Sequence, residues 1–162
     1  RIGKVFACDL VFHNAYGPDK PWFYDSNLSG GGCVMDLGVH LVDLSLWVMN
    51  FPDVASVASD LFAGGANLQP GSAHVEDYAT ATLKFANGAV AQLACSWKVS
   101  AGCDAIIEAN FYGTAGGLSF HNVNGSFYDF IAEAFPGTSR TVLPSPPAAS
   151  GRLSAVPRAV TL

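Results

Sequence analysis

Charged side chains are scarce in this sequence. Only 13% of its 162 residues are Asp, Glu, Lys or Arg, whereas about 25% is usual in soluble domains. Hydrophobic residues make up 50% of the chain, so we expect apolar surface to be left over for a partner. The net charge is −5 and no basic cluster occurs, which argues against binding to nucleic acid or to an anionic membrane.

Other features are missing as well. We find no uninterrupted apolar run of the roughly 20 residues that a membrane-spanning helix needs. The start, Arg1-Ile2-Gly3-Lys4, has neither an initiating methionine nor the apolar core of a signal peptide. We therefore expect a chain that begins partway along the protein. No C-x-x-C spacing occurs, so we predict reduced core thiols rather than a metal site or disulfides at Cys8, Cys33, Cys95 and Cys103. Reduced thiols lead us to expect a cytoplasmic protein.

The most informative stretch runs from Gly30 to Met49. Three glycines lead into a proline-free segment whose apolar residues recur at intervals of three and four, which predicts a helix from Cys33 to Met49. Two adjacent apolar rows leave little of this helix for water. Its polar exceptions share one side of the helix, and they are Asp36, His40 and Asp43.

Asp36 and His40 lie four residues apart, which places their Cβ atoms roughly 6 Å from each other on a helix. A carboxylate at that distance can orient an imidazole. Because an unperturbed histidine has a pKa of about 6.5, such a pair can transfer protons at cellular pH. A pair of this kind can equally be a satisfied structural pair, so the spacing alone leaves both interpretations open.

The glycines before the helix lack a Cβ, so a ligand can approach the first-turn amides. They do not form a dinucleotide fingerprint, because a polar loop rather than a strand precedes them. The whole run GGGCVMDLGVHLVDLSLW nevertheless resembles the substrate-domain signature of the Gfo/Idh/MocA oxidoreductases, a glycine-rich turn followed by a D-x-G-x-H helix. The resemblance extends more loosely from Ile2 to Phe130.

The resemblance implies a two-domain enzyme. An N-terminal Rossmann domain, absent from this chain, holds NAD or NADP, and a C-terminal domain supplies the substrate pocket. It also implies that His40 is the acid/base acting on a substrate hydroxyl, that Asp36 assists it, and that a lysine from the nucleotide domain completes the site. We assign Gly31 and Gly32 to contact with the cofactor.

The segment from His13 to Asp25 is rich in prolines, aromatic rings and hydrogen-bonding groups, which is typical of a loop over a polyhydroxy ligand. In the family the corresponding loop lies near the substrate pocket. We predict that Tyr16, Trp22 and Asp25 bind substrate. In the alternative, Trp22 and Phe23 only anchor the loop to the core.

A second polar group lies just before one of the expected strands. His74, Glu76 and Asp77 suggest a metal site at first sight. Their alternation on entry to a strand is more typical of surface polar groups. We therefore predict no metal site.

Alternating apolar residues predict strands at 2–13, 54–62, 78–85, 90–97, 105–112, 118–121 and 126–130. The pair Asn87-Gly88 predicts a tight hairpin between the third and fourth of these. With one main helix, this order predicts an α+β fold with an open, predominantly antiparallel sheet and the helix on one face. The other face needs a partner, and the family commonly uses it as a subunit interface, so we expect a homo-oligomer.

We divide the chain into a substrate-binding and oligomerisation domain at 1–135 and an irregular tail, rich in Pro, Ser and Ala, at 136–162. Pro157 would interrupt the terminal helix that is usual in the family. Our hypothesis is the substrate half of an NAD(P)-dependent oxidoreductase that acts by hydride transfer on a sugar, polyol or related hydroxy compound, inactive as a fragment. The rival is a non-catalytic open-sheet module for oligomerisation or ligand binding.

Overall fold

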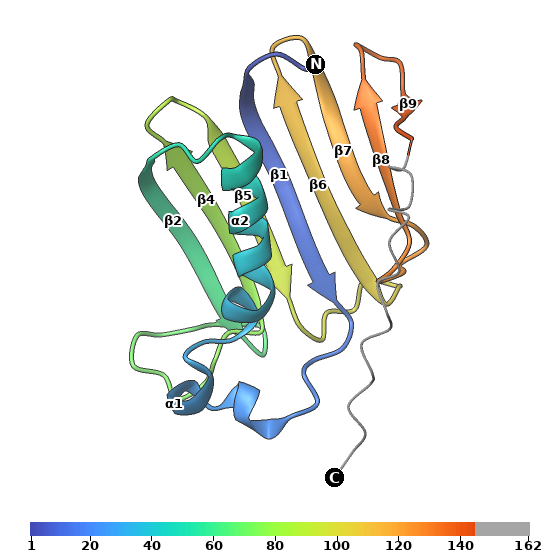
Figure 1. Ribbon diagram of the computed structural model, residues 1–162. Helices are drawn as coiled ribbons and strands as arrows, with labels where there is room; N and C mark the ends of the chain where they lie inside the picture. Colours follow the sequence, from blue (N-terminus) through green and yellow to red (C-terminus); the bar gives the residue numbers. More distant parts are fainter. Residues whose placement is uncertain (145–162) are drawn as a thin grey trace, which may run out of the picture.

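The computed structural model describes residues 1–144, which form one nine-stranded sheet with helices on one face (Figure 1). The strands are β1 (Val5–Asn14), β2 (Val54–Ala63), β3 (Ala66–Asn67), β4 (Tyr78–Phe85), β5 (Val90–Ser96), β6 (Ala105–Gly113), β7 (Gly116–Asn122), β8 (Phe130–Phe135) and β9 (Thr141–Val142). The helical segments are a 3-10 turn (Pro21–Tyr24), α1 (Ser26–Ser29), a π turn (Val34–Gly38) and α2 (Val39–Val48).

The strand order is β3-β2-β4-β5-β1-β6-β7-β8-β9. β1 pairs in parallel with β5 and antiparallel with β6. The remaining paired neighbours are antiparallel. This confirms the predicted α+β fold with an open, predominantly antiparallel sheet and one main helix on one face.

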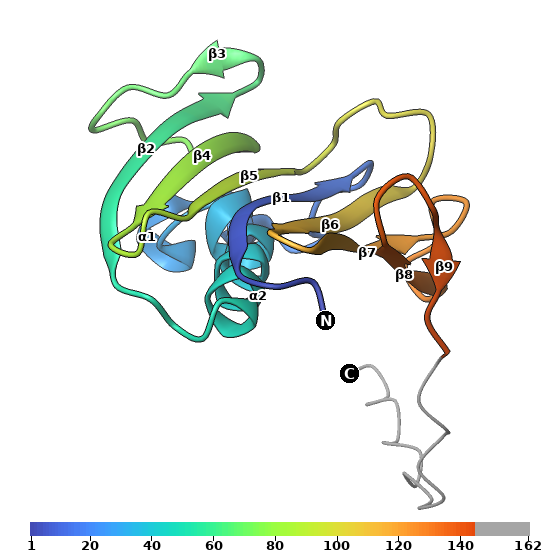
Figure 2. The ribbon, with the colours of Figure 1, turned by 90° about the horizontal axis from the view of Figure 1, so that it is seen from above.

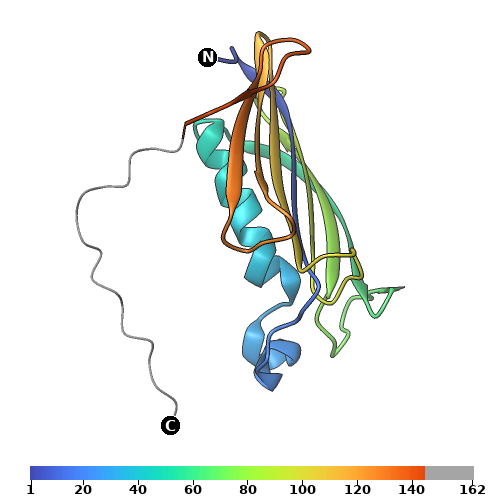
Figure 3. The same ribbon diagram turned by 90° about the vertical axis from the view of Figure 1, so that its right-hand side faces the viewer.

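The core lies between α2 and the middle of the sheet. Figure 2 shows α2 beneath β4, β5 and β1, whereas no helix of the described residues lies beneath β6 to β9. Alternate side chains from the strands, including Leu10, Leu83 and Leu93, pack with Leu37 and Leu41 from the helical stretch, and all five are buried. Burial of a leucine contributes roughly 2 kcal/mol. Figure 3 shows the sheet edge-on, and its opposite face carries no helix in the described part of the chain.

The signature helix begins with an irregular turn. Residues Val34–Gly38 form a π turn, in which the amide of Val39 donates to the carbonyl of Val34, and only then does α2 follow. A Cβ on Gly38 would lie 3.3 Å from Sγ of Cys95. Glycine therefore allows this turn to pack closely against β5. Single π turns occur frequently at functional sites.

A buried carboxylate closes the start of this helix. Oε1 of Glu76 accepts hydrogen bonds from the amides of Gly32 (2.9 Å) and Val34 (3.0 Å), and its carbonyl accepts one from the amide of Cys33 (2.9 Å). Glu76 is only 6% exposed. The expectation of a surface polar group is therefore wrong at Glu76. Its charge is compensated by donors at the positive end of the helix.

The four cysteines are free, and Cys8, Cys33 and Cys95 are buried in the core, which agrees with the prediction of core thiols at these three positions. Cys103 is only half-buried, so the prediction of a core position is wrong for it. Sγ of Cys33 lies 3.8 Å from Sγ of Cys95. Burial raises the pKa of Cys8 to about 12, so this thiol stays protonated at neutral pH. Within residues 1–144 no group of three or more His, Cys, Asp or Glu is arranged to hold a metal ion.

The structure differs from the expected strands near the C-terminus. The predicted strand at 126–130 is wrong: Ser126 lies in a turn, where its hydroxyl accepts from the amides of Tyr128 and Asp129. β8 begins only at Phe130. Local side-chain bonds of this kind favour turns over strands. β9 adds a two-residue strand within the segment predicted to be irregular. Residues 145–162, including Pro157, lie outside the described part.

One stretch is long and apolar enough to cross a membrane by length and composition alone, namely Ser26–Val48, with 23 residues and a mean hydropathy of 1.3. The expectation that no stretch qualifies is therefore wrong by that measure. The core helix of a soluble protein can have the same length and composition. Here the stretch is interrupted between α1 and the π turn and packs against β5 and β1.

We predict that Gly32→Ala lowers the free energy of unfolding by about 3 kcal/mol, because a Cβ at this position collides with the carbonyl oxygen of Glu76. The matched control is Gly31→Ala, whose Cβ meets the side chain of Met35, which is exposed and free to turn aside. We expect that control to lose less than about 1 kcal/mol. Urea unfolding followed by tryptophan fluorescence measures both. An equal loss of unfolding free energy in the two variants would show that the backbone around Gly32 shifts to accommodate the added Cβ.

Candidate functional site

The predicted catalytic carboxylate is held by a tryptophan at the carboxyl end of β5. Asp36 lies in the π turn and is half-buried. Its Oδ2 accepts a hydrogen bond of 2.9 Å from Nε1 of Trp97. Trp97 follows the last residue of β5 and is only 2% exposed. The pattern in the sequence gave no sign of this partner, because the two residues are 61 positions apart.

His40 lies in the first turn of α2, and its side chain is exposed. The structure of residues 1–144 contains no hydrogen bond between Asp36 and His40. The four-residue spacing implied a regular α-helix, whereas a π turn ends between these two residues and alters their angular relation. The predicted pairing is therefore not formed here. The catalytic roles of both residues stay predictions.

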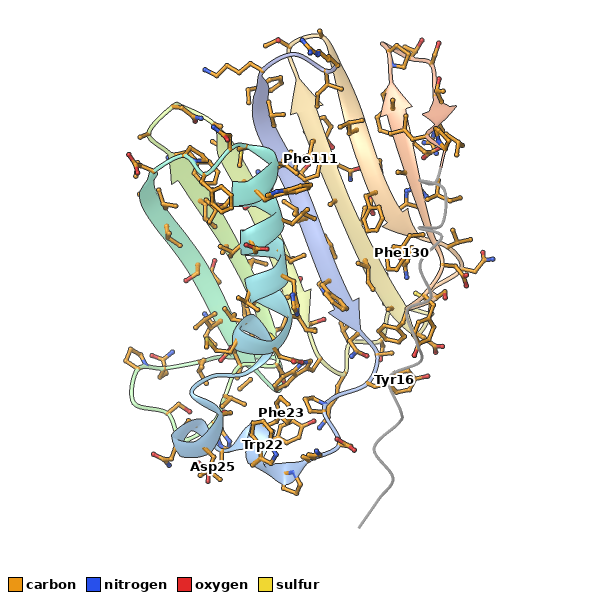
Figure 4. The ribbon with its side chains drawn as sticks, viewed as in Figure 1. Tyr16, Trp22, Phe23, Asp25, Phe111 and Phe130 are labelled. Carbon is orange, nitrogen blue, oxygen red and sulfur yellow. The ribbon has the colours of Figure 1, made fainter. Side chains whose placement is uncertain are left out.

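The loop after β1 is anchored through aromatic rings (Figure 4). The ring of Phe23 meets Trp97 edge-on, with centroids 6.2 Å apart, and Tyr24 does so at 5.6 Å. Trp22 stacks on Phe23 at 3.9 Å and remains 44% exposed. Nζ of Lys98 lies 4.3 Å from the centre of the Tyr24 ring. Anchoring thus falls to Phe23 and Tyr24, and part of Trp22 is left open to a ligand.

The other two predicted substrate residues have local partners. Asp25 is the N-cap of α1, where its Oδ1 accepts from the amide of Asn27 at 2.9 Å. Tyr16 donates its hydroxyl to Oδ1 of Asp104 at 2.7 Å. Figure 4 shows Trp22 and Asp25 below the helix, and Tyr16 set apart toward β6. The structure therefore brings Trp22 and Asp25 to one region and does not bring Tyr16 to it.

The glycines assigned to the cofactor differ from each other. Gly32 is buried and its amide is taken by Glu76. Gly31 is half-buried, and its amide makes only a long contact of 3.4 Å with Oγ of Ser29. The expected row of unpaired first-turn amides is therefore not present at Gly32. Its lack of a Cβ instead permits the close approach of Glu76.

Residues of this region line two cavities. An apolar cavity of about 490 Å³ lies between the π turn, α2 and β2, β4 and β5, but neither Asp36 nor His40 lines it. A smaller cleft of about 360 Å³ is lined by residues that include Tyr24, Asp77, Trp97 and Lys98. Neither Asp36 nor His40 lines this cleft either, but Trp97 lines it and donates a hydrogen bond to Asp36. A hydroxylated ligand needs polar partners, so we place the candidate site around Asp36, His40 and Trp97 rather than in the larger apolar cavity.

Comparisons with known proteins identify relatives. A family model described as GFO/IDH/MocA C-terminal domain matches residues 1–119. The chain is 31% identical over 127 residues to 1,5-anhydro-D-fructose reductase of Ensifer adhaerens, covering 76% of this chain and 35% of that protein. It is 29% identical over 106 residues to D-glucoside 3-dehydrogenase of Escherichia coli (strain K12), covering 60% and 30%. The chain thus spans about a third of the length of these curated relatives.

Solved structures share the fold. GenD2 from gentamicin A biosynthesis, in complex with NAD, is 26% identical with a TM-score of 0.62, covering 78% of this chain and 37% of that chain. The aldose-aldose oxidoreductase from Caulobacter crescentus, complexed with glycerol, has a TM-score of 0.71 at 20% identity, covering 90% and 42%. The second likeness bears on the fold alone.

We predict that Asp104→Asn lowers the pKa of Tyr16. The hydrogen bond to Asp104 and the negative charge of that carboxylate raise the pKa of Tyr16 above its usual value near 10. The contact with Asp104 stabilises the folded protein at pH values below the pKa of Tyr16 in the unfolded chain. This stabilisation is lost as the pH rises through the higher pKa of Tyr16 in the folded protein. Absorbance titration at alkaline pH measures the shift, and Tyr16→Phe identifies the signal. An unchanged titration would show that the contact is absent in solution.

Proposed function

Because this chain belongs to the Gfo/Idh/MocA family of oxidoreductases, we propose that it is the substrate half of an NAD(P)-dependent enzyme that oxidises or reduces a sugar, polyol or related hydroxy compound. The observation that carries the proposal is the D-x-G-x-H turn, which places an exposed imidazole and a half-buried carboxylate on one helical stretch. The names of the curated relatives, a D-glucoside dehydrogenase and an anhydrofructose reductase, support a sugar as substrate.

The residues at this site suit a nicotinamide cofactor bound mainly by another domain. His40 is exposed, and one oxygen of Asp36 has no hydrogen bond within the described residues. Both groups can therefore face a substrate that lies against a separate nucleotide domain. The amide of Gly31 has only a weak hydrogen-bond partner, so it can still contact a cofactor. Gly32 does not fit a cofactor contact, because its amide donates to Glu76. The NAD in GenD2 supports this cofactor class and does not separate NAD from NADP.

The bound nicotinamide supplies the site that accepts or delivers hydride. In the direction of oxidation, a ring nitrogen of His40 accepts the proton of the substrate hydroxyl. The free oxygen of Asp36 orients the imidazole once substrate is bound, since catalytic hydrogen bonds are often long before the substrate arrives. The exposed part of Trp22 packs against the C–H face of a sugar ring, and the second oxygen of Asp25 accepts from a hydroxyl.

The uncovered face of the sheet supports a homo-oligomer. Thr80, Ala94, Val11 and Glu108 lie in register across β4, β5, β1 and β6 on this face. The three middle side chains of this row, Thr80, Ala94 and Val11, are uncharged and half-buried, and carboxylates flank them at Asp60 on β2 and Glu108 on β6. No helix of residues 1–144 lies above the row (Figure 3). A sheet face of this composition suits an isologous contact with a second copy. The cytoplasmic location expected from the sequence belongs to the same proposal.

We predict that His40→Ala in the complete enzyme lowers kcat at least a hundredfold, because general acid–base catalysis contributes roughly a hundredfold or more. The dissociation constant for NAD or NADP changes little. Turnover is measured with a panel of aldoses, D-glucosides and anhydro sugars. Asp43→Ala on the same helix serves as control, since Asp43 is exposed. Unchanged turnover, or equal losses in turnover and cofactor binding, would refute the role of His40 and favour the non-catalytic module.

We predict that Ala94→Glu converts the oligomer to monomers, because it buries one carboxylate per copy in a contact that repeats by symmetry. The control is Gln69→Glu, which adds the same charge to an exposed loop. Sedimentation velocity at micromolar concentrations measures the mass. A wild-type monomer, or an identical mass for all three proteins, would contradict the assignment of this face.

A further inference from the structure

Trp97 stands out among the residues to which the proposed reaction gives no role. Its indole lies between the Asp36 carboxylate and two aromatic rings of the loop after β1. Its backbone amide donates to the carbonyl of Asp77 at 2.7 Å. The indole is therefore fixed at its backbone, at its ring faces or edges, and at Nε1.

The backbone after Trp97 is also constrained. Lys98 has a φ of +56°, in the left-handed region that costs a non-glycine residue energy. Its amide donates to the carbonyl of Tyr16 at 3.2 Å, and its ammonium group lies over the ring of Tyr24. The chain thus turns at Lys98, at the end of β5. Trp97 itself continues the alternation of Ala91, Leu93 and Cys95, whose side chains lie in the core on the helix side, so its indole reaches Asp36 in the π turn.

We propose that Trp97 is a positioning residue for Asp36 in the reaction described above. The N–H of the indole fixes Oδ2, which leaves the other carboxylate oxygen without a hydrogen bond within residues 1–144 and available to His40 or to substrate. A half-buried aspartate in the wide π turn has no other side-chain hydrogen bond within residues 1–144. Because Phe23 and Tyr24 contact the same indole, the loop that is predicted to cover the substrate is linked mechanically to the carboxylate.

The inference rests on the proposed function, but the hydrogen bond can be tested without it. The chain has three tryptophans, so a ¹⁵N-labelled sample gives three indole N–H signals. We expect that of Trp97 to exchange slowly with solvent and to move markedly in Asp36→Ala. Asp43→Ala, the matched control on the same helix, leaves it in place. If Asp36→Ala does not move the Trp97 signal, the bond is absent and the proposal is overturned.

The second measurement separates positioning from simple packing. In the complete enzyme, Trp97→Phe keeps an aromatic ring and removes the donor. We expect kcat to fall roughly tenfold, the effect of one hydrogen bond to a charged group, with little change in the KM for the cofactor. Trp47→Phe, an exposed tryptophan on α2, is the control for the same chemical change and retains full activity.

A double-variant cycle completes the test. If Trp97 acts through Asp36, then adding Trp97→Phe to Asp36→Asn produces no further loss of kcat. If the double variant instead loses kcat by the product of the two single-variant factors, Trp97 only supports the fold, and the proposal is wrong. If the wild-type enzyme oxidises no sugar in the panel with NAD or NADP, the proposed function fails, and the indole signals still decide whether Trp97 holds Asp36.

Discussion

The buried carboxylate of Glu76 is the interaction on which the site depends. It ties the residues just before β4 to the first turn of the signature helix through two amides, while its own carbonyl binds a third. Burying a charge costs several kcal/mol unless donors surround it, and here the donors come from the positive end of a helix. Gly32 is required because any side chain would occupy the place of the Glu76 carbonyl. The position of Asp36, four residues later, follows from this clamp.

Sequence periodicity was sufficient to predict the helices and hairpins whose structure depends on residues close together in the chain. The predicted hairpin is confirmed, with Gly88 at a φ of +84° and the amide of Ala89 bound to the side chain of Asn87. The helix predicted from Cys33 to Met49 corresponds to the π turn and α2. Both features depend on residues close in sequence. The fold class followed because one main helix among consecutive strands allows few arrangements.

The features that could not be predicted depend on contacts between distant residues. Glu76 meets Gly32 across 44 positions, and Trp97 meets Asp36 across 61. Nothing in the local pattern around either residue indicates these partners. The π turn has no signature in the sequence, so the pair at Asp36 and His40 was predicted as neighbours on an ideal helix. The glycines were interpreted as a ligand contact, whereas at Gly32 the missing Cβ serves close packing of the backbone.

The low charge content has a structural counterpart in two surfaces that this chain leaves uncovered. On the helix side, β6 to β8 have no helix over them, and Phe120 stacks on Phe130 at 4.8 Å while remaining 40% exposed. On the other side, no helix of residues 1–144 covers the sheet (Figure 3). The contacts that we propose with a second copy and with a nucleotide domain would cover these two surfaces. The exposed imidazole of His40 fits its proposed role, because an acid/base group beside a separately bound cofactor must lie at the edge of its own domain rather than in its core.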